Sequence, residues 1–134
     1  MPIALAAASL LLASQAPARN IQVAARIGNG FSPSEPSVAI HPRNPDQILI
    51  GVILDRAISS RDGGKTWTDV TLKSTYGVHG DPVVAIDPQG RSYFLHLAGN
   101  RGGDTWLDRI VCQTSDDGGL TWKKAPVPVM ASVA

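Results

Sequence analysis

The residues of this chain that could do chemistry are carboxylates, arginines and a histidine that stand in turns between apolar stretches. The strongest candidates are Asp55 and Asp81. The further candidates for contact with a ligand are Glu35, Arg56, His79, Arg101 and Asp104, with Trp106 as a weaker member. Carboxylates exchange protons with a substrate, and guanidinium groups bind carboxylates through paired hydrogen bonds. We therefore expect proton transfer or anion binding, if the chain does either, to occur at these turns.

The two strongest candidates also have purely structural interpretations. In the tight turn Leu54-Asp55-Arg56, the aspartate forms the turn and pairs with Arg56. Asp81 stands directly before Pro82, where it either caps the following strand or faces a ligand. The sequence leaves both alternatives open.

Several other classes of site are not predicted. His41 is expected in a turn and His96 in a strand, and no histidine, cysteine and aspartate residues have the spacing of metal ligands. Residues 116–118 lack the carboxylate pattern of a calcium loop and its distal glutamate. Since no phosphate-binding loop is found either, we predict no cofactor.

The lone Cys112 cannot form an intrachain disulfide and is expected to pack in a strand as a small hydrophobic residue.

The charge of the chain is equally uninformative about large partners. The formal net charge is +1 at pH 7 over 134 residues, and both signs are mixed along the sequence. Neither a nucleic-acid partner nor a polybasic membrane patch is therefore indicated.

The elements that position the candidates come from an internal repeat. Residues 60–67 match residues 115–122 as S-x-D-G-G-x-T-W, and residues 38–42 match residues 84–88 as V-A-I-x-P. The two motifs occur in the same order in both copies, which indicates two copies of one structural unit.

Each copy divides into four short strands separated by turn residues. The expected strands are 36–40, 47–54, 56–60 and 66–72 in the first copy and 82–86, 91–98, 107–114 and 121–127 in the second. Four antiparallel strands in a repeat of this length describe a β-propeller blade. We therefore predict an all-β fold of two four-stranded antiparallel sheets, with blades at about residues 33–75 and 76–128.

The S-x-D-G-G-x-T-W motif is expected to reverse the third strand of each blade into the fourth. Glycine adopts the torsions of a tight reversal, the aspartate accepts backbone N–H groups, and the tryptophan buries its ring against the neighbouring blade. The residues with these structural roles are Ser60, Asp62, Gly64, Thr66, Trp67, Ser115, Asp117, Gly119, Thr121 and Trp122.

The pattern Ser-x-Asp-x-Gly-x-Thr-Trp is the Asp box, and the chain resembles the sialidase-like (neuraminidase) superfamily of Asp-box, or BNR-repeat, β-propellers over residues 33–128. The resemblance implies that the Asp boxes lie on the rim away from the ligand and that the candidate turns face it. It also implies an arginine triad, an aspartate as general acid and a tyrosine nucleophile assisted by a glutamate. Asp55 occupies the turn of the acid, so Asp55 and Asp81 become the candidate catalytic residues.

The first blade departs from the sialidase pattern at one position. The resemblance implies an Arg-Ile-Pro motif at the start of this blade, but residues 34–37 read Ser-Glu-Pro-Ser, with Glu35 where the arginine is expected. Residues 26–28, Arg-Ile-Gly, lie upstream of the strand and lack the proline.

The two ends of the chain predict export and an incomplete propeller. Residues 1–18 have the apolar run and the Ala-Pro-Ala ending of a signal peptide, so we expect a secreted or periplasmic protein with no membrane span after cleavage. Residues 19–32 are expected to be a linker, and residues 129–134 a connection toward a missing blade. Because propellers have four to eight blades, we expect an N-terminal fragment completed by blades in cis or by other copies in trans.

Two functions follow as hypotheses. The first is an exported sialidase-like glycoside hydrolase, of which this chain is an N-terminal part that is inactive on its own. The alternative is a non-catalytic propeller that binds a glycan or protein ligand, which Glu35 favours.

Overall fold

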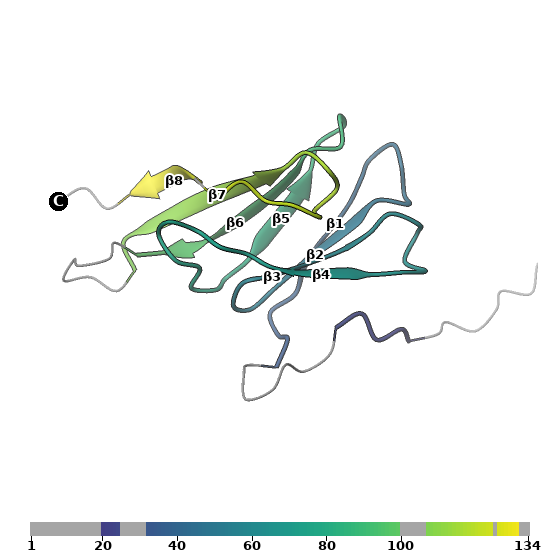
Figure 1. The fold of residues 1–134 in the computed structure, drawn as a ribbon, viewed down its shortest axis with the longest axis horizontal. Coiled ribbons are helices and arrows are strands. Elements are labelled where there is room, and N and C mark those ends of the chain that lie inside the picture. The colour runs from purple at the N-terminus through teal and green to yellow at the C-terminus, as the bar shows by residue number, and fades with distance from the viewer. Residues whose placement is uncertain (1–19, 25–31, 100–106, 125, 132–134) are drawn as a thin grey trace, which may run out of the picture.

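The computed structural model describes residues 20–24, 32–99, 107–124 and 126–131. Within these residues the fold is all-β, with two four-stranded antiparallel sheets, as predicted (Figure 1). No helix in the described ranges has the length and apolar character needed to cross a membrane.

Both sheets are simple meanders in which each strand pairs with the next one along the chain. The first sheet consists of β1 (Ser37–Ile40), β2 (Ile48–Val52), β3 (Arg56–Ser60) and β4 (Thr68–Thr71). The second sheet consists of β5 (Val83–Ile86), β6 (Ser92–Ala98), β7 (Arg109–Ser115) and β8 (Val127–Ala131). Strands β1 and β5 lie side by side, so the two sheets contact each other through their first strands.

Alternating burial along β6 defines the inner face of the second sheet, whereas all five residues of β3 in the first sheet are buried, so both faces of that strand are covered. In β6 every second side chain is buried, and Phe94 is completely inaccessible. The core draws on both sheets and consists of Leu49, Ala57, Leu72, Val84 and Phe94. The hydrophobic effect therefore stabilises the pairing of the two sheets as well as each sheet alone.

The two sheets come into close contact at Gly51 in β2. A Cβ atom there would lie 2.8 Å from Cγ1 of Val84 and 3.0 Å from both Phe94 and Pro82. Gly51 is thus a glycine because the second sheet occupies the space of a side chain.

Hydrogen bonds fix the relative position of the sheets around this contact. The Val84 amide donates to Ser37 Oγ at 3.1 Å, and Gln47 Nε2 donates to the Gly90 carbonyl at 3.0 Å. From the second sheet, Gln113 Nε2 donates to the Lys73 carbonyl at 3.0 Å.

The fourth strand of the second sheet differs from the prediction. It was expected at residues 121–127, but β8 spans Val127–Ala131, so part of the expected connection at 129–134 belongs to the sheet. The chain touches β7 at Lys123, whose amide donates to the Thr114 carbonyl at 3.0 Å, and pairs again only from Val127. Pro126 and Pro128 cannot donate to a strand ladder, and such residues are tolerated only on an edge strand such as β8.

Cys112 lies in a strand, β7, as expected, but it is less buried than a core residue. It is half-buried and pairs with Leu95, on the face of the second sheet that points away from the first sheet. Partial burial raises the pKa of its thiol.

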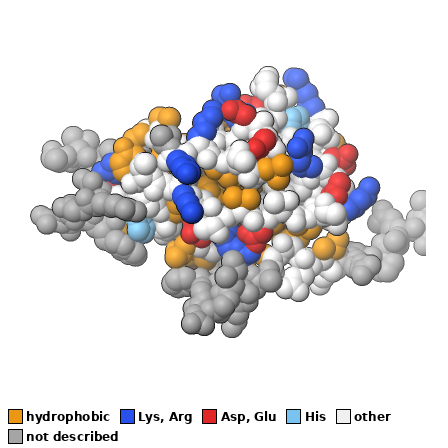
Figure 2. Space-filling model, viewed as in Figure 1, with side chains coloured by type: hydrophobic (Ala, Val, Ile, Leu, Met, Phe, Trp, Pro, Cys, Tyr) orange, Lys and Arg blue, Asp and Glu red, His pale blue; other side chains and the backbone are white. Residues whose placement is uncertain are grey.

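The surface carries no single-sign field on the face seen in Figure 2. Acidic and basic side chains alternate there, with apolar side chains between them (Figure 2). This distribution matches the small net charge of the chain.

The close approach at Gly51 gives a test of the sheet pairing. We expect Gly51→Ala to destabilise the protein by about 1–3 kcal/mol, because the added methyl group overlaps Val84 and Phe94. Urea unfolding followed by circular dichroism measures the change. The double variant Gly51→Ala with Phe94→Leu is expected to cost less than the two single changes added together, since the smaller side chain makes room. Equal stability of Gly51→Ala and the wild type would contradict the observed packing.

Candidate functional site

The turns of the molecule lie at two opposite ends because all strand pairs are antiparallel. One end, here called the Asp-box end, holds both Asp-box turns, and the other, here called the loop end, holds residues 34–36, 53–55 and 79–82. At the loop end the Ile53 amide donates to the Ser34 carbonyl at 3.1 Å, and a Cβ on Gly80 would lie 3.2 Å from Cγ1 of Ile53. The structure therefore brings together the turns that carry Glu35, Asp55 and Asp81, and separates them from the Asp boxes.

The first Asp box is a closed hydrogen-bond network. Asp62 Oδ1 accepts the amides of Lys65 and Thr66 at 3.0 and 2.9 Å, and Oδ2 accepts the Thr66 hydroxyl at 2.6 Å. Ser60 Oγ donates to Asp62 Oδ1 at 2.8 Å and accepts the Gly64 amide at 2.8 Å. The turn thus satisfies its backbone donors with two side chains of the same motif.

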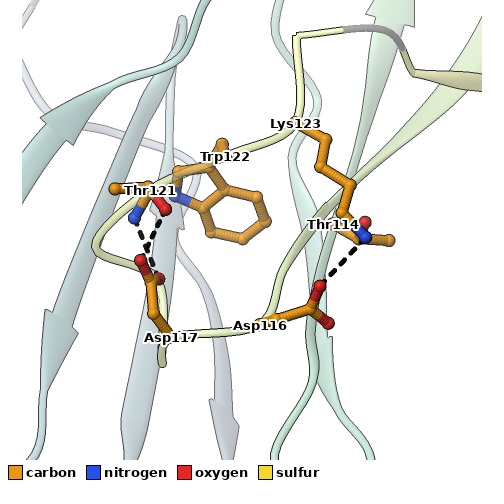
Figure 3. Close-up of a pocket in the computed structure, with 6 residues that line it drawn as sticks. All are labelled: Thr114, Asp116, Asp117, Thr121, Trp122 and Lys123. Atoms are coloured by element: carbon orange, nitrogen blue, oxygen red, sulfur yellow. Dashed lines mark hydrogen bonds and ion pairs between the residues drawn. The ribbon is translucent and has the colours of Figure 1, made fainter.

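The second Asp box repeats this network with Ser115, Asp117, Gly119 and Thr121. Figure 3 shows the part of it between Asp117 and Thr121. Hydrogen bonds from the Thr66 hydroxyl and amide lower the pKa of Asp62 to about 2. Partial burial raises the pKa of Asp117, but hydrogen bonds from Thr121 and Ser115 outweigh it and bring that pKa to about 2 as well. The box aspartates are therefore ionised structural groups, as predicted.

The two tryptophans make the same local hydrogen bond but pack differently. Nε1 of Trp67 donates to the Gly64 carbonyl and Nε1 of Trp122 to the Gly119 carbonyl, both at 3.0 Å. Both side chains are half-buried. The Trp122 ring stands edge-on to Phe94 at 5.9 Å and packs against the core that both sheets share, which confirms the expected inter-sheet role for this residue.

Two acidic residues occupy equivalent positions before the first strand of each sheet. Glu35 precedes Pro36 and β1, and Asp81 precedes Pro82 and β5. Both are exposed, and both have a positive φ, 50° and 49°, which non-glycine residues rarely adopt.

Hydrogen bonds from Ile53, directly after β2, and from Leu97 in β6 hold this backbone shape. The carbonyl before Asp81, that of Gly80, accepts the Leu97 amide at 3.1 Å, as the Ser34 carbonyl before Glu35 accepts the amide of Ile53. The fold thus holds two carboxylates in strained, solvent-facing turns.

Arg56, the expected turn partner of Asp55, also reaches across to the fourth strand of its sheet. Arg56 is buried and makes an ion pair with Asp69 on β4, in which Nε donates to Oδ1 at 3.0 Å. Asp55 is half-buried, and its carbonyl accepts the Leu72 amide. Burial raises the pKa of Asp55, although its own backbone amide and the charge of Arg56 act in the opposite direction.

The remaining histidines have structural positions. Nδ1 of His41 accepts the amides of Arg43 and Asn44, which confirms its turn role. The His79 amide donates to the Leu97 carbonyl at 3.0 Å, so His79 belongs to the loop end. His96 lies in β6 and is buried; burial lowers the pKa of its imidazole.

Buried polar side chains between the sheets were not predicted from the sequence. Within the described residues, Ser59 Oγ, His96 Nε2 and Gln113 Oε1 are buried without a hydrogen-bond partner. Nδ1 of His96 contacts the Leu97 carbonyl at 2.9 Å and therefore carries the proton. The only signal in the sequence was the alternation that places His96 on the same face as Phe94.

Three candidates cannot be placed, because Arg101, Asp104 and Trp106 lie outside the described residues. The same holds for the predicted signal peptide and for most of the predicted linker. Among the described residues, no group of three histidine, cysteine or acidic side chains could hold a metal ion.

Comparison of the chain with protein-family models, with curated proteins and with solved structures finds no match. The sialidase-like relationship therefore stays a prediction that depends on the two Asp boxes.

The low pKa values of the box aspartates predict acid instability. Their folded pKa of about 2 lies below the unfolded value of about 3.9, so their stabilising contribution is complete above about pH 4 and is lost as the pH falls toward 2. We expect the melting temperature to fall over this range, and Asp117→Asn to have both a lower melting temperature at pH 7 and a weaker pH dependence. Asp46→Asn, an exposed carboxylate outside the boxes, is the control. An unchanged pH profile in Asp117→Asn would contradict the network.

The different packing of the tryptophans predicts unequal costs of truncation. Trp122→Ala is expected to lower the free energy of unfolding by about 2–3 kcal/mol, less than a fully buried tryptophan, because the ring is half-buried against Phe94. Trp67→Ala is expected to cost less than Trp122→Ala, since Trp67 is not part of the shared core. Guanidinium unfolding of both variants measures the difference, and a larger loss for Trp67→Ala would reverse our assignment.

Proposed function

We propose that this chain forms the first two blades of an exported, sialidase-like propeller whose loop end binds an uncharged glycan. On its own the chain is expected to hydrolyse no glycoside. The observation that carries the proposal is the repeated placement of Glu35 and Asp81, which are exposed, strained and equivalent in the two sheets.

Strained, exposed residues at equivalent positions favour a binding role. A positive φ at a non-glycine residue costs free energy and is concentrated at functional sites. Carboxylate oxygens accept hydrogen bonds from hydroxyl groups, which are the groups a neutral sugar displays. The two sheets therefore present similar acceptors side by side for successive parts of one ligand.

The charge of the loop end supports a neutral glycan over a sialylated one. Glu35, Asp55 and Asp81 contribute three carboxylates there. Two of the nearby cations are engaged within the chain, since Arg56 pairs with Asp69 and Arg109 with Asp108 at 2.6 Å. A carboxylate-bearing sugar would meet like charges at this end of the described chain.

Hydrolysis by a full-length parent is the second candidate, and one observation favours it. Burial raises the pKa of Asp55, which is the direction that keeps a general acid protonated near neutral pH. The other groups of such a site would have to come from further blades.

A glycan array carrying neutral and sialylated glycans tests the binding proposal. We expect the chain to bind neutral glycans more strongly, and Glu35→Gln with Asp81→Asn to weaken that binding by about tenfold, the size expected for lost charge-assisted hydrogen bonds. Asp46→Asn, at the Asp-box end, serves as the matched control and should bind like the wild type. Preference for sialylated glycans, or equal binding by all variants, would contradict the proposal.

A fluorogenic sialoside tests the statement on hydrolysis. We expect this chain to release no fluorophore. If the wild type releases it and Asp55→Asn does not, the result would instead support hydrolysis with Asp55 as general acid.

A further inference from the structure

The outer face of the second sheet is the side that points away from the first sheet. Within the described residues, no side chain that β5, β6 or β7 places on this face is buried. Val83 and Val127, at the two edges of the sheet, are 56% and 67% exposed. In the first sheet, by contrast, all five residues of β3 are buried. The second sheet therefore keeps one open face.

Four apolar side chains cross this open face in a single row. The strand register places Val83 beside Leu95, and Leu95 beside Cys112. Cys112 in turn pairs with Val127, so the row runs from β5 at one edge of the sheet to β8 at the other. A contiguous exposed apolar row of this kind indicates a surface that binds another protein surface.

Charged side chains border the row on the side of the Asp-box end. Arg91 stands directly before β6 and Asp116 directly after β7, and Nε of Arg91 lies 2.6 Å from Oδ1 of Asp116. Nζ of Lys123 lies 2.9 Å from the other oxygen, Oδ2. The face thus combines an apolar centre with a charged, solvent-accessible border, which is the arrangement of protein interfaces.

We propose that the outer face of the second sheet binds the same face of a second copy of this chain, in a symmetric dimer. The two-fold axis lies between the two copies, parallel to the strands and midway between β6 and β7. The two sheets then pack about 10 Å apart with their strand directions within about 30° of each other, as in a β-sandwich. Both copies use the same residues, so the contact closes on itself.

The apolar row is complementary to itself under this symmetry. The rotation places β6 of one copy over β7 of its partner, and β5 over β8. Leu95 therefore meets the partner's Cys112 on the central strands, where a large side chain faces a small one. Val83 meets the partner's Val127 at the edges, where the two side chains have equal size. The packed volume is thus similar along the whole row.

The charged border is complementary to itself as well. The same rotation places Arg91 opposite the partner's Asp116, and Asp116 opposite the partner's Arg91. Asp116 keeps the ammonium group of Lys123 when Arg91 turns toward the second copy. Opposite charges therefore face each other across the contact, which favours this orientation of the two copies.

The edge of the second sheet is less suited to a second copy than its face. The edge strand β8 contains Pro128, which has no N–H group to donate. Proline on an edge strand opposes the addition of a further strand, because the ladder of hydrogen bonds would be interrupted there. A second copy is therefore expected on the face of the sheet.

The size of the face sets the strength of the contact. The sheet has four strands, of which the central two have seven residues each. At the usual strand spacing and rise per residue, the face covers about 440 Å² in each copy. A footprint of about 900 Å² over both copies is in the range of weak, reversible complexes. We therefore expect a dimer that dissociates on dilution.

Sedimentation velocity on the purified chain over a range of concentrations tests the proposal. We expect the wild type to pass from monomer to dimer as its concentration rises, with no larger species. Val83→Glu and Val127→Arg are each expected to weaken dimerisation by more than about tenfold, because each places an unpaired charge in the contact. Val38→Arg is the matched control, since Val38 is 58% exposed on the other sheet, and it should dimerise like the wild type.

The double variant Val83→Glu with Val127→Arg tests the symmetry of the contact. Within one chain these positions stand at opposite edges of the sheet, about 14 Å apart, which is too far for an ion pair. Across the proposed axis they face each other. We therefore expect the double variant to recover dimerisation, and an equal mixture of the two single variants to form heterodimers. If neither dimerises, the symmetric arrangement is wrong.

The thiol of Cys112 provides a measurement on the unmodified protein. In the dimer the partner's Leu95 covers Cys112, so we expect its reaction with an excess of a maleimide to slow as the protein concentration rises. Circular dichroism confirms that each variant is folded. A wild type that stays monomeric, with a thiol whose reactivity does not depend on concentration, would overturn the proposal and leave this face to a further blade.

Discussion

The structure depends on the direct contact of two sheets at Gly51. A four-stranded meander buries neither face when it is alone, so its apolar face needs a partner surface. Here the inner face of each sheet is the partner of the other, and the missing side chain at Gly51 lets Val84 and Phe94 approach the backbone of β2. The hydrogen bonds of Gln47 and Gln113 then fix the register between the sheets. This contact also sets how the turns of the first sheet lie relative to those of the second.

The Asp boxes connect local turn chemistry to that contact. Each box supplies acceptors for the amides of its own turn, so the reversal needs no help from the rest of the chain. In the second box the same geometry places Gly119 against the first sheet and the Trp122 ring against Phe94. A motif that is local in sequence therefore contributes to a contact between residues far apart in the chain.

Much of the fold could be predicted because the repeat and the turn residues are local signals. The two sheets, the strand order and the structural role of the boxes follow from matching residues such as Asp62 and Asp117. The position of β8 could not be predicted, since Trp122 and Thr121 favour a strand that the chain forms only after Pro126. The ion pair of Arg56 with Asp69 also escaped prediction, because it depends on the register between β3 and β4.

The candidate site was predicted as a set of turns, but the positive φ of Glu35 and Asp81 is visible only in three dimensions.

The two copies of the repeat have the same strand order, but their side chains differ at equivalent positions on the sheet faces. Glycine at 51 and leucine at 95 occupy the same position in the two copies, and so do Gln47 and Arg91. The first member of each pair serves a contact that the chain completes by itself, whereas the second stands on the outer face of the second sheet or at its rim. At the loop end the opposite holds, because Glu35 and Asp81 have the same charge and nearly the same φ. The two sheets therefore differ at the faces that pack and agree at the loop end, and this agreement is the observation on which the proposed glycan binding rests.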